Sequence, residues 1–164
     1  RIVKFGGFLN LKSDRLLGAD RAPSSRFVGP IPSSFLELTV MSIVIVDDSA
    51  VVRDMLREML AKLEGAEVVG EFESPAPAIE SIRNNPPEVI VLDMQLVNGS
   101  GLEVLRAVSA AHPSVKIVVF TNFAEDVYRK RCLEAGAYAF YDKKSDLPAL
   151  RQTLHGLASA GRVN

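Results

Sequence analysis

The sequence lacks the features that mark membrane-spanning, disulfide-linked and nucleic-acid-binding proteins. No apolar run comes near the roughly 18 residues needed to cross a bilayer, and Cys132 is the one cysteine, so an internal disulfide is excluded. A formal net charge of −1 gives no basic footprint for nucleic acid. These absences favour a protein of the reducing cytoplasm, and we expect no direct contact with a membrane or with nucleic acid.

Residues 1–40 and 41–164 differ in composition. The first forty residues carry six basic and three acidic residues, whereas the remainder carries 13 basic and 17 acidic residues. Glycine and proline interrupt residues 1–40, and these residues hold no continuous apolar segment of a secretory signal. Met41 stands directly before the first strand-like run. We therefore predict a disordered or non-native N-terminal extension over 1–40 and one folded domain over 41–164, with a short functional arm as the alternative.

Five short apolar runs alternate with helical patterns from Met41 onward, and hydrophobic residues make up 48% of the chain, enough for a buried core. The runs are rich in Val and Ile and mostly do not alternate with polar residues, which is typical of parallel strands covered on both faces. They are Ile43–Val46, Glu67–Phe72, Val89–Leu92, Ile117–Phe120 and Ala137–Tyr141.

Apolar residues at helical spacing predict five helices between and after these runs. The sets are Val52, Met55, Leu56, Met59, Leu60 and Leu63; Leu102, Leu105 and Val108; and Leu147, Leu150, Leu154 and Leu157. Residues 76–83 predict a short helix, and residues 125–135 a weaker, highly charged one. Five βα units with right-handed crossovers form an α/β fold. We expect a flavodoxin-like, doubly wound, five-stranded parallel sheet of order 2-1-3-4-5, with helices on both faces.

Polar residues follow the predicted strands at the edge where doubly wound sheets bind their ligands. Asp47 and Asp48 follow the first strand, Asp93 the third, Thr121 the fourth and Lys143 the fifth. Three neighbouring carboxylates repel one another, a conflict that a hard divalent cation such as Mg²⁺ removes. Because an ammonium and a hydroxyl can bind phosphate oxygens, the set predicts phosphoryl transfer to a carboxylate.

Each of these residues also has a plainer interpretation. Asp47 and Asp48 could cap the following helix, Asp93 and Thr121 could be turn residues, and Lys143 could be solvated surface. Their occurrence together at one end of one sheet favours the functional interpretation.

Four segments also carry a resemblance to a known family. They are IVIVDDS (43–49), VIVLDMQLVNGSGLEVL (89–105), VVFTN (118–122) and AGAYAFYDKKS (135–145). In order and spacing they resemble the receiver domain of bacterial two-component response regulators, and the likeness extends over residues 41–164.

The resemblance implies a role for each residue of the set. Asp93 would be the modified residue that accepts the phosphoryl group, and Thr121 and Lys143 would bind its oxygens. Asp48 would bind Mg²⁺ directly and Asp47 through water. Two further ligands would be the Asp93 carboxylate and the backbone carbonyl of Gln95.

The resemblance also implies a conformational switch. Thr121 would move toward the phosphoryl group, and the ring of Phe140 would turn inward behind it. Phe140 lacks the hydroxyl of a tyrosine, so we expect the ring to be buried. The sequence departs from the family pattern at Val97 and Lys144, where proline is frequent.

A receiver domain implies signalling by phosphorelay. A histidine kinase or a histidine phosphotransfer protein would supply the phosphoryl group, and the domain would catalyse only its own phosphotransfer and dephosphorylation. We predict one closing helix at about 146–159. A stand-alone receiver and the N-terminal piece of a longer regulator both stay open, as do the downstream target and a homodimer.

Other function classes fit the pattern less well. A haloacid-dehalogenase-type phosphatase would need an acid where Gln95 stands. Flavin or cobalamin binding would need a phosphate-binding loop after the first strand or a histidine near Asp93, and the sequence offers neither. A phosphorylation-independent pseudo-receiver, a pure interaction module, is the alternative that we retain, although the complete acidic set and Lys143 argue against it.

Overall fold

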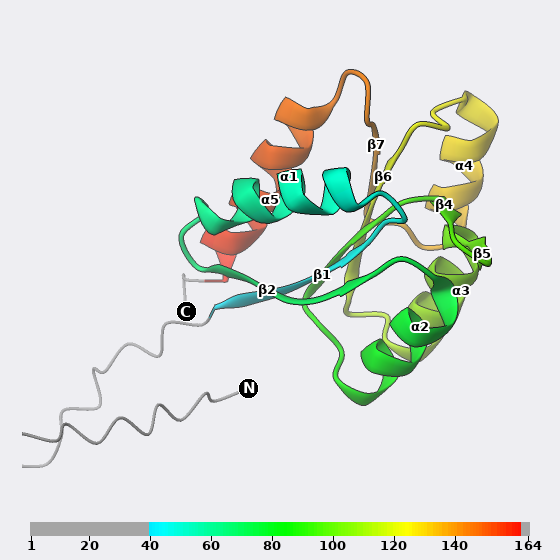
Figure 1. Cartoon of the computed structure of the whole chain (residues 1–164), viewed down its shortest axis with the longest axis horizontal. Coiled ribbons are helices and arrows are strands. Elements are labelled where there is room, and N and C mark those ends of the chain that lie inside the picture. Colours follow the sequence, from blue (N-terminus) through cyan, green and yellow to red (C-terminus); the bar gives the residue numbers. More distant parts are fainter. Residues whose placement is uncertain (1–39, 162–164) are drawn as a thin grey trace, which may run out of the picture. The chain divides into compact units, whose positions relative to one another are not determined.

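The computed structural model describes residues 40–161, which form five βα units around one parallel sheet (Figure 1). The strands of this sheet are β1 Met41–Val46, β2 Ala66–Phe72, β3 Val89–Leu92, β6 Lys116–Thr121 and β7 Ala139–Asp142. The helices are α1 Ala50–Ala61, α2 Pro75–Asn84, α3 Gly101–Ala111, α4 Asp126–Glu134 and α5 Leu147–Ala160. Apart from Val40, the extension predicted at the N-terminus lies outside the described residues.

The strand order is β2-β1-β3-β6-β7, and every neighbouring pair is parallel. This arrangement confirms the predicted doubly wound order. Because all strands run the same way, the residues that follow β1, β3, β6 and β7 reach the same edge of the sheet. That edge is the ligand-binding edge of an open α/β sheet.

Successive side chains of the central strands point to opposite faces, and each face has its own apolar core. In β1, Val44 and Val46 pack on one face against α2 and α3, whereas Ile43 and Ile45 pack on the other against α1 and α5. The two groups of helices lie on opposite sides of the sheet in Figure 1. The central strands β1, β3 and β6 are almost wholly buried, as their unbroken apolar runs predict.

The edge strand β2 departs from this pattern. Val68 pairs with Ile43 and Gly70 pairs with Val44, so the register shifts and Val69 has no partner residue in β1. The side chain of Val69 is consequently 52% exposed. Such irregularities are common at sheet edges, where only one neighbouring strand fixes the register.

Two further features differ from the sequence-based expectation. Met55 has helical spacing with Val52 and Met59, yet it is 36% exposed while Leu56 is fully buried, because the face of α1 that reaches the sheet is narrower than the apolar pattern. A two-stranded antiparallel hairpin, β4 Gln95–Leu96 and β5 Gly99–Ser100, precedes α3 and was not predicted. Two-residue strands carry too little pattern to be recognised from sequence.

Capping residues explain where two of the helices begin. Ser49 is the N-cap of α1, and its Oγ accepts a hydrogen bond from the Val52 amide at 3.4 Å. Ser100 and Glu103 form a reciprocal capping box at the start of α3. Within residues 40–161, no helix combines the length and the apolar character needed to cross a membrane.

Helix α4 is held by much less apolar contact than the other helices. Cys132 is its one buried residue, and Val127, Tyr128 and Leu133 are exposed. The thiol of Cys132 lies 3.4 Å from the thioether sulfur of Met94. The charged, weakly amphipathic pattern of residues 125–135 therefore corresponds to a real helix with little core to fix it.

The core on the α1 and α5 face should depend strongly on Leu56. This side chain is fully buried, so Leu56→Ala should lower the free energy of unfolding by about 2–5 kcal/mol through lost burial and the cavity left behind. Urea denaturation followed by circular dichroism measures this change. Val51→Ala is the matched control, since Val51 is 78% exposed in the same helix. Equal losses of the free energy of unfolding in the two variants would contradict the assignment of the buried face of α1.

Candidate functional site

The candidate site lies at the carboxyl edge of the sheet, where polar residues from four strands meet. Asp47 follows β1, Asp93 follows β3, Thr121 ends β6 and Lys143 follows β7. Three of these are buried: Asp47 is 2% exposed, Asp93 5% and Thr121 0%. The structure thus brings together the residues that the sequence predicted as a set.

Lys143 joins the two buried carboxylates. Its ammonium nitrogen lies 2.6 Å from Oδ2 of Asp47 and 2.6 Å from Oδ2 of Asp93, and its side chain is 9% exposed. Buried charges are stable only when they are paired and hydrogen-bonded, so these contacts fix all three side chains. Lys143 is therefore a structural part of the site and not the solvated surface residue of the plainer interpretation.

Asp48 completes a cluster of three carboxylates. Oxygen atoms of Asp47, Asp48 and Asp93 lie within 4.8 Å of one another, with Asp48 exposed and the other two buried. Hard carboxylate oxygens at this spacing, open to solvent on one side, suit a small divalent cation.

The backbone around Asp93 lies very close to the first residue of α3, Gly101. Oδ1 of Asp93 accepts a hydrogen bond from the Gln95 amide at 3.3 Å, whereas the Gln95 side chain is exposed. A Cβ atom at Gly101 would collide with the backbone oxygen of Asp93, so only glycine allows α3 to start this close to the site.

Neither Asp47 nor Asp48 is the N-cap of α1, which is Ser49. Oδ1 of Asp47 instead accepts a hydrogen bond from the Ser49 amide at 2.9 Å, while Oδ2 faces Lys143. Both carboxylate oxygens of Asp47 therefore have partners, and the Asp48 carboxylate remains exposed.

Burial and crowding shift the pKa values of two pocket residues. Burial raises the pKa of Asp47 by more than hydrogen bonds from Lys143 and Ser49 lower it, and the nearby charge of Asp93 adds to the rise. Burial by itself would lower the pKa of Lys143, but its hydrogen bonds to Asp47 and Asp93 raise it above the ordinary value. Lys143 stays charged, and the pocket holds more negative charge than this one ammonium balances.

Thr121 and Phe140 occupy neighbouring strands. The Thr121 hydroxyl accepts a hydrogen bond from the Phe123 amide at 3.3 Å, and the Thr121 carbonyl accepts one from the Lys143 amide at 2.9 Å. The Phe140 side chain is 4% exposed, as expected for a ring without a hydroxyl. Thr121 thus links the strand end to the loop that leads into α4.

Arg129 of α4 holds Phe140 in two ways. Its Nη1 donates a hydrogen bond to the Phe140 carbonyl at 2.8 Å, and its guanidinium carbon lies 4.7 Å from the centre of the Phe140 ring. A cation over an aromatic face attracts the ring electrostatically. This contact fastens α4 to β7 where apolar packing is sparse, and it was not predicted from the sequence.

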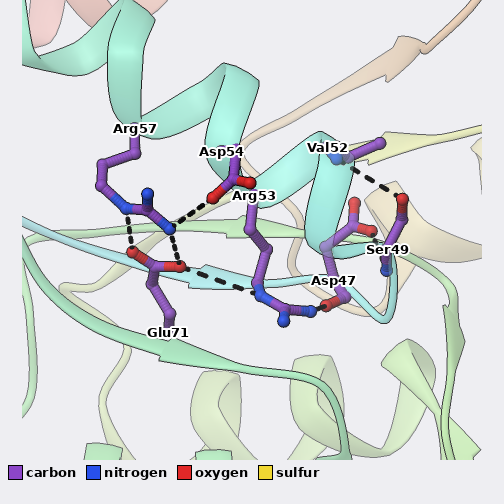
Figure 2. A network of polar contacts seen from close by, with 7 residues as sticks. All are labelled: Asp47, Ser49, Val52, Arg53, Asp54, Arg57 and Glu71. Carbon is purple, nitrogen blue, oxygen red and sulfur yellow. Dashed lines mark hydrogen bonds and ion pairs between the residues drawn. The ribbon is translucent and has the colours of Figure 1, made fainter.

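Arg53 of α1 also escaped prediction. Its Nη1 donates a hydrogen bond to the backbone carbonyl of Asp47 at 2.7 Å (Figure 2). The sequence spacing of six residues carries no recognisable signal, since a charged residue in the first turn of an exposed helix face ordinarily points to solvent.

The fold and the site together define a class of protein: a doubly wound α/β domain with clustered carboxylates and an ion-paired lysine at the carboxyl edge of its sheet. Residues 43–155 match the family model of the response regulator receiver domain, and the chain belongs to this family. It contains a receiver domain of two-component response regulators, a signalling domain.

The relatives agree with this assignment. The chain is 32% identical over 123 residues to response regulator GacA of Pseudomonas syringae pv. syringae (strain B728a), a match that covers 75% of this chain and 57% of that protein. It is 34% identical over 118 residues to protein-glutamate methylesterase/protein-glutamine glutaminase 5 of Myxococcus xanthus (strain DK1622), covering 70% of this chain and 34% of that enzyme. The chain therefore spans little more than half the length of GacA.

A solved structure shows the same architecture. The two-component response regulator of the LuxR family from Aurantimonas sp. SI85-9A1 is similar with a TM-score of 0.67 and 27% identity. The match covers 73% of this chain and 85% of that one.

Asp47→Asn should stabilise the protein against unfolding when divalent cations are absent. Burial raises the pKa of Asp47, so ionisation of this carboxyl group destabilises the folded state. This destabilisation is absent below the ordinary value of 3.8 and is complete once the pH exceeds the higher folded-state value. The variant should therefore have the higher Tm at neutral pH, and the difference should shrink as the pH falls toward 3.8. Scanning calorimetry in EDTA measures both effects.

The exposed neighbour provides the control for this experiment. Asp48→Asn removes the same charge from the same loop, but its carboxylate is solvated and should give a smaller rise in Tm. Equal Tm values for Asp47→Asn and the wild type at neutral pH would contradict the electrostatic account of the pocket.

Arg129→Ala should loosen α4. Loss of a hydrogen bond worth about 1 kcal/mol raises local opening by roughly fivefold, so amide hydrogen exchange in α4 should quicken by that order. Hydrogen exchange with mass spectrometry measures this change. Lys130→Ala is the control, because Lys130 is 78% exposed and makes only a 3.9 Å ion pair with Glu134. Unchanged exchange in Arg129→Ala would show that other contacts hold the helix.

Proposed function

We propose that Asp93 accepts a phosphoryl group from a phosphohistidine on a histidine kinase or a histidine phosphotransfer protein. The observation that carries this proposal is the setting of Asp93, which is 5% exposed, is 2.6 Å from the Lys143 ammonium, and lies beside two further carboxylates. A positioned carboxylate with adjacent positive charge is suited to in-line attack on phosphorus. Residues 41–164 form the receiver domain in this proposal.

The carboxylate cluster fits a hard divalent cation, and we assign it to Mg²⁺. The exposed Asp48 would hold the ion directly, together with Asp93 and the backbone carbonyl of Gln95. Asp47 would contribute through water, as the resemblance to receiver domains implies. When bound, the ion neutralises negative charge on the phosphoryl oxygens.

The remaining chemistry belongs to the residues of the chain. Oδ2 of Asp93 is held by Lys143, whereas Oδ1 has a longer bond of 3.3 Å to the Gln95 amide, so Oδ1 is the freer nucleophile. This oxygen bonds to phosphorus as the phosphorus–nitrogen bond of the phosphohistidine breaks. The electron pair of that bond stays on the imidazole. Lys143 stabilises the charge on the oxygens of the transferring group.

Thr121 is placed to respond to the new phosphoryl group. Its hydroxyl oxygen accepts a hydrogen bond from the Phe123 amide, so the hydroxyl proton remains available to donate to a phosphoryl oxygen. Movement of Thr121 would alter the loop into α4, and Phe140 and the weakly packed α4 would move with it. A local charge thereby shifts the population of two packings.

The surface that changes is exposed and partly apolar. Val127, Tyr128 and Leu133 of α4 and Tyr138 before β7 are between 45% and 61% exposed. Aromatic and aliphatic side chains of this kind suit a protein partner, which could be a second copy in a homodimer. We propose no direct nucleic-acid or membrane contact by this domain, and a cytoplasmic location. Its catalysis is limited to its own phosphotransfer and dephosphorylation.

The output of the whole protein is a separate part of the proposal. Since the chain spans 57% of GacA, the longer relatives contain segments that this chain does not match. A stand-alone receiver that binds a separate target and a receiver that controls an attached output domain both fit residues 41–164.

Incubation of the 164-residue chain with acetyl phosphate and Mg²⁺ should add one phosphoryl group. Intact-mass spectrometry measures the gain, which should vanish in Asp93→Asn and in the presence of EDTA. Asp142→Asn is a matched control, since Asp142 ends β7 at the same edge of the sheet but is not among the three clustered carboxylates. We expect this variant to keep the gain.

The opposite result would favour the alternative. No gain in wild-type protein that unfolds cooperatively would overturn phosphoryl transfer and leave a phosphorylation-independent pseudo-receiver. A gain retained in Asp93→Asn would instead move the acceptor to another residue. No observation in residues 40–161 favours the pseudo-receiver at present.

A further inference from the structure

Arg53 connects the acidic pocket to the edge of the sheet. It lies in the first turn of α1, and its side chain is 18% exposed. One end of its guanidinium donates from Nη1 to the backbone carbonyl of Asp47 at 2.7 Å. The other end faces strand β2, where Nε lies 3.8 Å from Oε2 of Glu71. Figure 2 shows Arg53 extended between these two acceptors.

Glu71 is itself held firmly. Arg57 donates to both of its carboxylate oxygens, at 2.7 Å from Nε and 3.0 Å from Nη2, and the same guanidinium lies 2.8 Å from Asp54. A two-point contact between a guanidinium and a carboxylate fixes the orientation of both planes. Glu71 is therefore held by Arg57, and Arg53 meets it at the longer distance of 3.8 Å.

Asp47 is bound through its backbone on both sides. Its amide donates to the Phe72 carbonyl of β2 at 2.9 Å, and its carbonyl accepts from Arg53. These two bonds fix the peptide planes on either side of the Asp47 Cα atom. The direction of the Asp47 carboxylate and the start of the peptide that leads to Asp48 follow from that placement. Both residues belong to the carboxylate cluster.

We propose that Arg53 is a positioning residue for the acidic pocket, fixing the Asp47–Asp48 backbone so that the three carboxylates converge on one cation. The inference rests on the proposed function, because it takes the cluster to be a divalent-cation site. Arg53 itself touches neither the cation nor the phosphoryl group. It acts through its 2.7 Å bond to the backbone carbonyl of Asp47, whereas its 3.8 Å contact with Glu71 is the weaker of the two.

A plainer role would be to hold α1 against the edge strand. In that case Arg53 would contribute to the stability of the fold but would not affect the affinity of the folded pocket. The two roles can be separated, since cation affinity measured on folded protein does not depend on the free energy of unfolding.

Arg53→Gln in the full chain tests the proposal. Amide chemical shifts from NMR spectra, recorded during a Mg²⁺ titration, give the dissociation constant. We expect it to rise by roughly threefold to tenfold, at or below the low end of the about 10–100-fold cost of losing an outer partner of a metal ligand, since Arg53 holds the backbone and not the carboxylate. Before any Mg²⁺ is added, the carbonyl carbon shift of Asp47 should also move. Arg53→Lys can keep one hydrogen bond, so its Mg²⁺ dissociation constant should lie between those of the wild type and Arg53→Gln.

Arg57→Gln is the matched control. Arg57 also bonds to Glu71, lies one turn further along α1, and is not a partner of Asp47. It should lower the Tm by an amount similar to that of Arg53→Gln and change the Mg²⁺ dissociation constant by less than about twofold, the usual effect of a substitution that does not touch a ligand's partners. An equal loss of Mg²⁺ affinity in both variants would show that Arg53 acts only through the ion pairs between α1 and β2, and would overturn the proposal.

The remaining outcomes separate this inference from the proposed function. If the wild type binds Mg²⁺ and Arg53→Gln binds it with the same affinity, only the positioning role of Arg53 is refuted and the cation site stands. Absence of Mg²⁺ binding in the wild type would refute the cation site and with it the premise of the inference.

Discussion

A single ammonium organises the functional edge of this domain. Lys143 lies between the carboxylates of Asp47 and Asp93, which follow two other strands, and its positive charge offsets the repulsion between them. The pocket still carries excess negative charge, because Asp48 adds a third carboxylate at its mouth. A divalent cation would balance this excess negative charge.

The elements around the pocket are held in two different ways. Strands β1, β3 and β6 are fixed by apolar burial on both faces, which is insensitive to a local change of charge. Helix α4 depends instead on Arg129 and on the contact of Cys132 with Met94. An element held by a few polar contacts can shift when a neighbouring charge changes, whereas the central strands cannot. The rigid strands position the site residues, and the loosely held α4 can move when the charge at the site changes.

Sequence reasoning succeeded where the pattern was local. Unbroken Val- and Ile-rich runs predicted the buried strands, and the carboxyl-edge rule placed Asp47, Asp93, Thr121 and Lys143 together. It failed where the outcome depended on how the elements pack and where side chains point. Met55 matched the helical period but missed the sheet, Val69 was displaced by a register shift, and Arg53 and Arg129 reach backbone carbonyls that no spacing rule connects to them.

The sequence by itself determined the α/β class, the strand order and which polar residues follow or end the strands at the carboxyl edge. Hydrophobic periodicity and the handedness of crossovers act over short stretches of chain and leave few alternatives. Only the tertiary structure decided that Asp47 is enclosed while Asp48 is open, that Lys143 bridges two carboxylates, and that Phe140 lies beneath Arg129. These features depend on side-chain directions and on burial between segments far apart in the chain, and burial is what sets the electrostatics of the pocket.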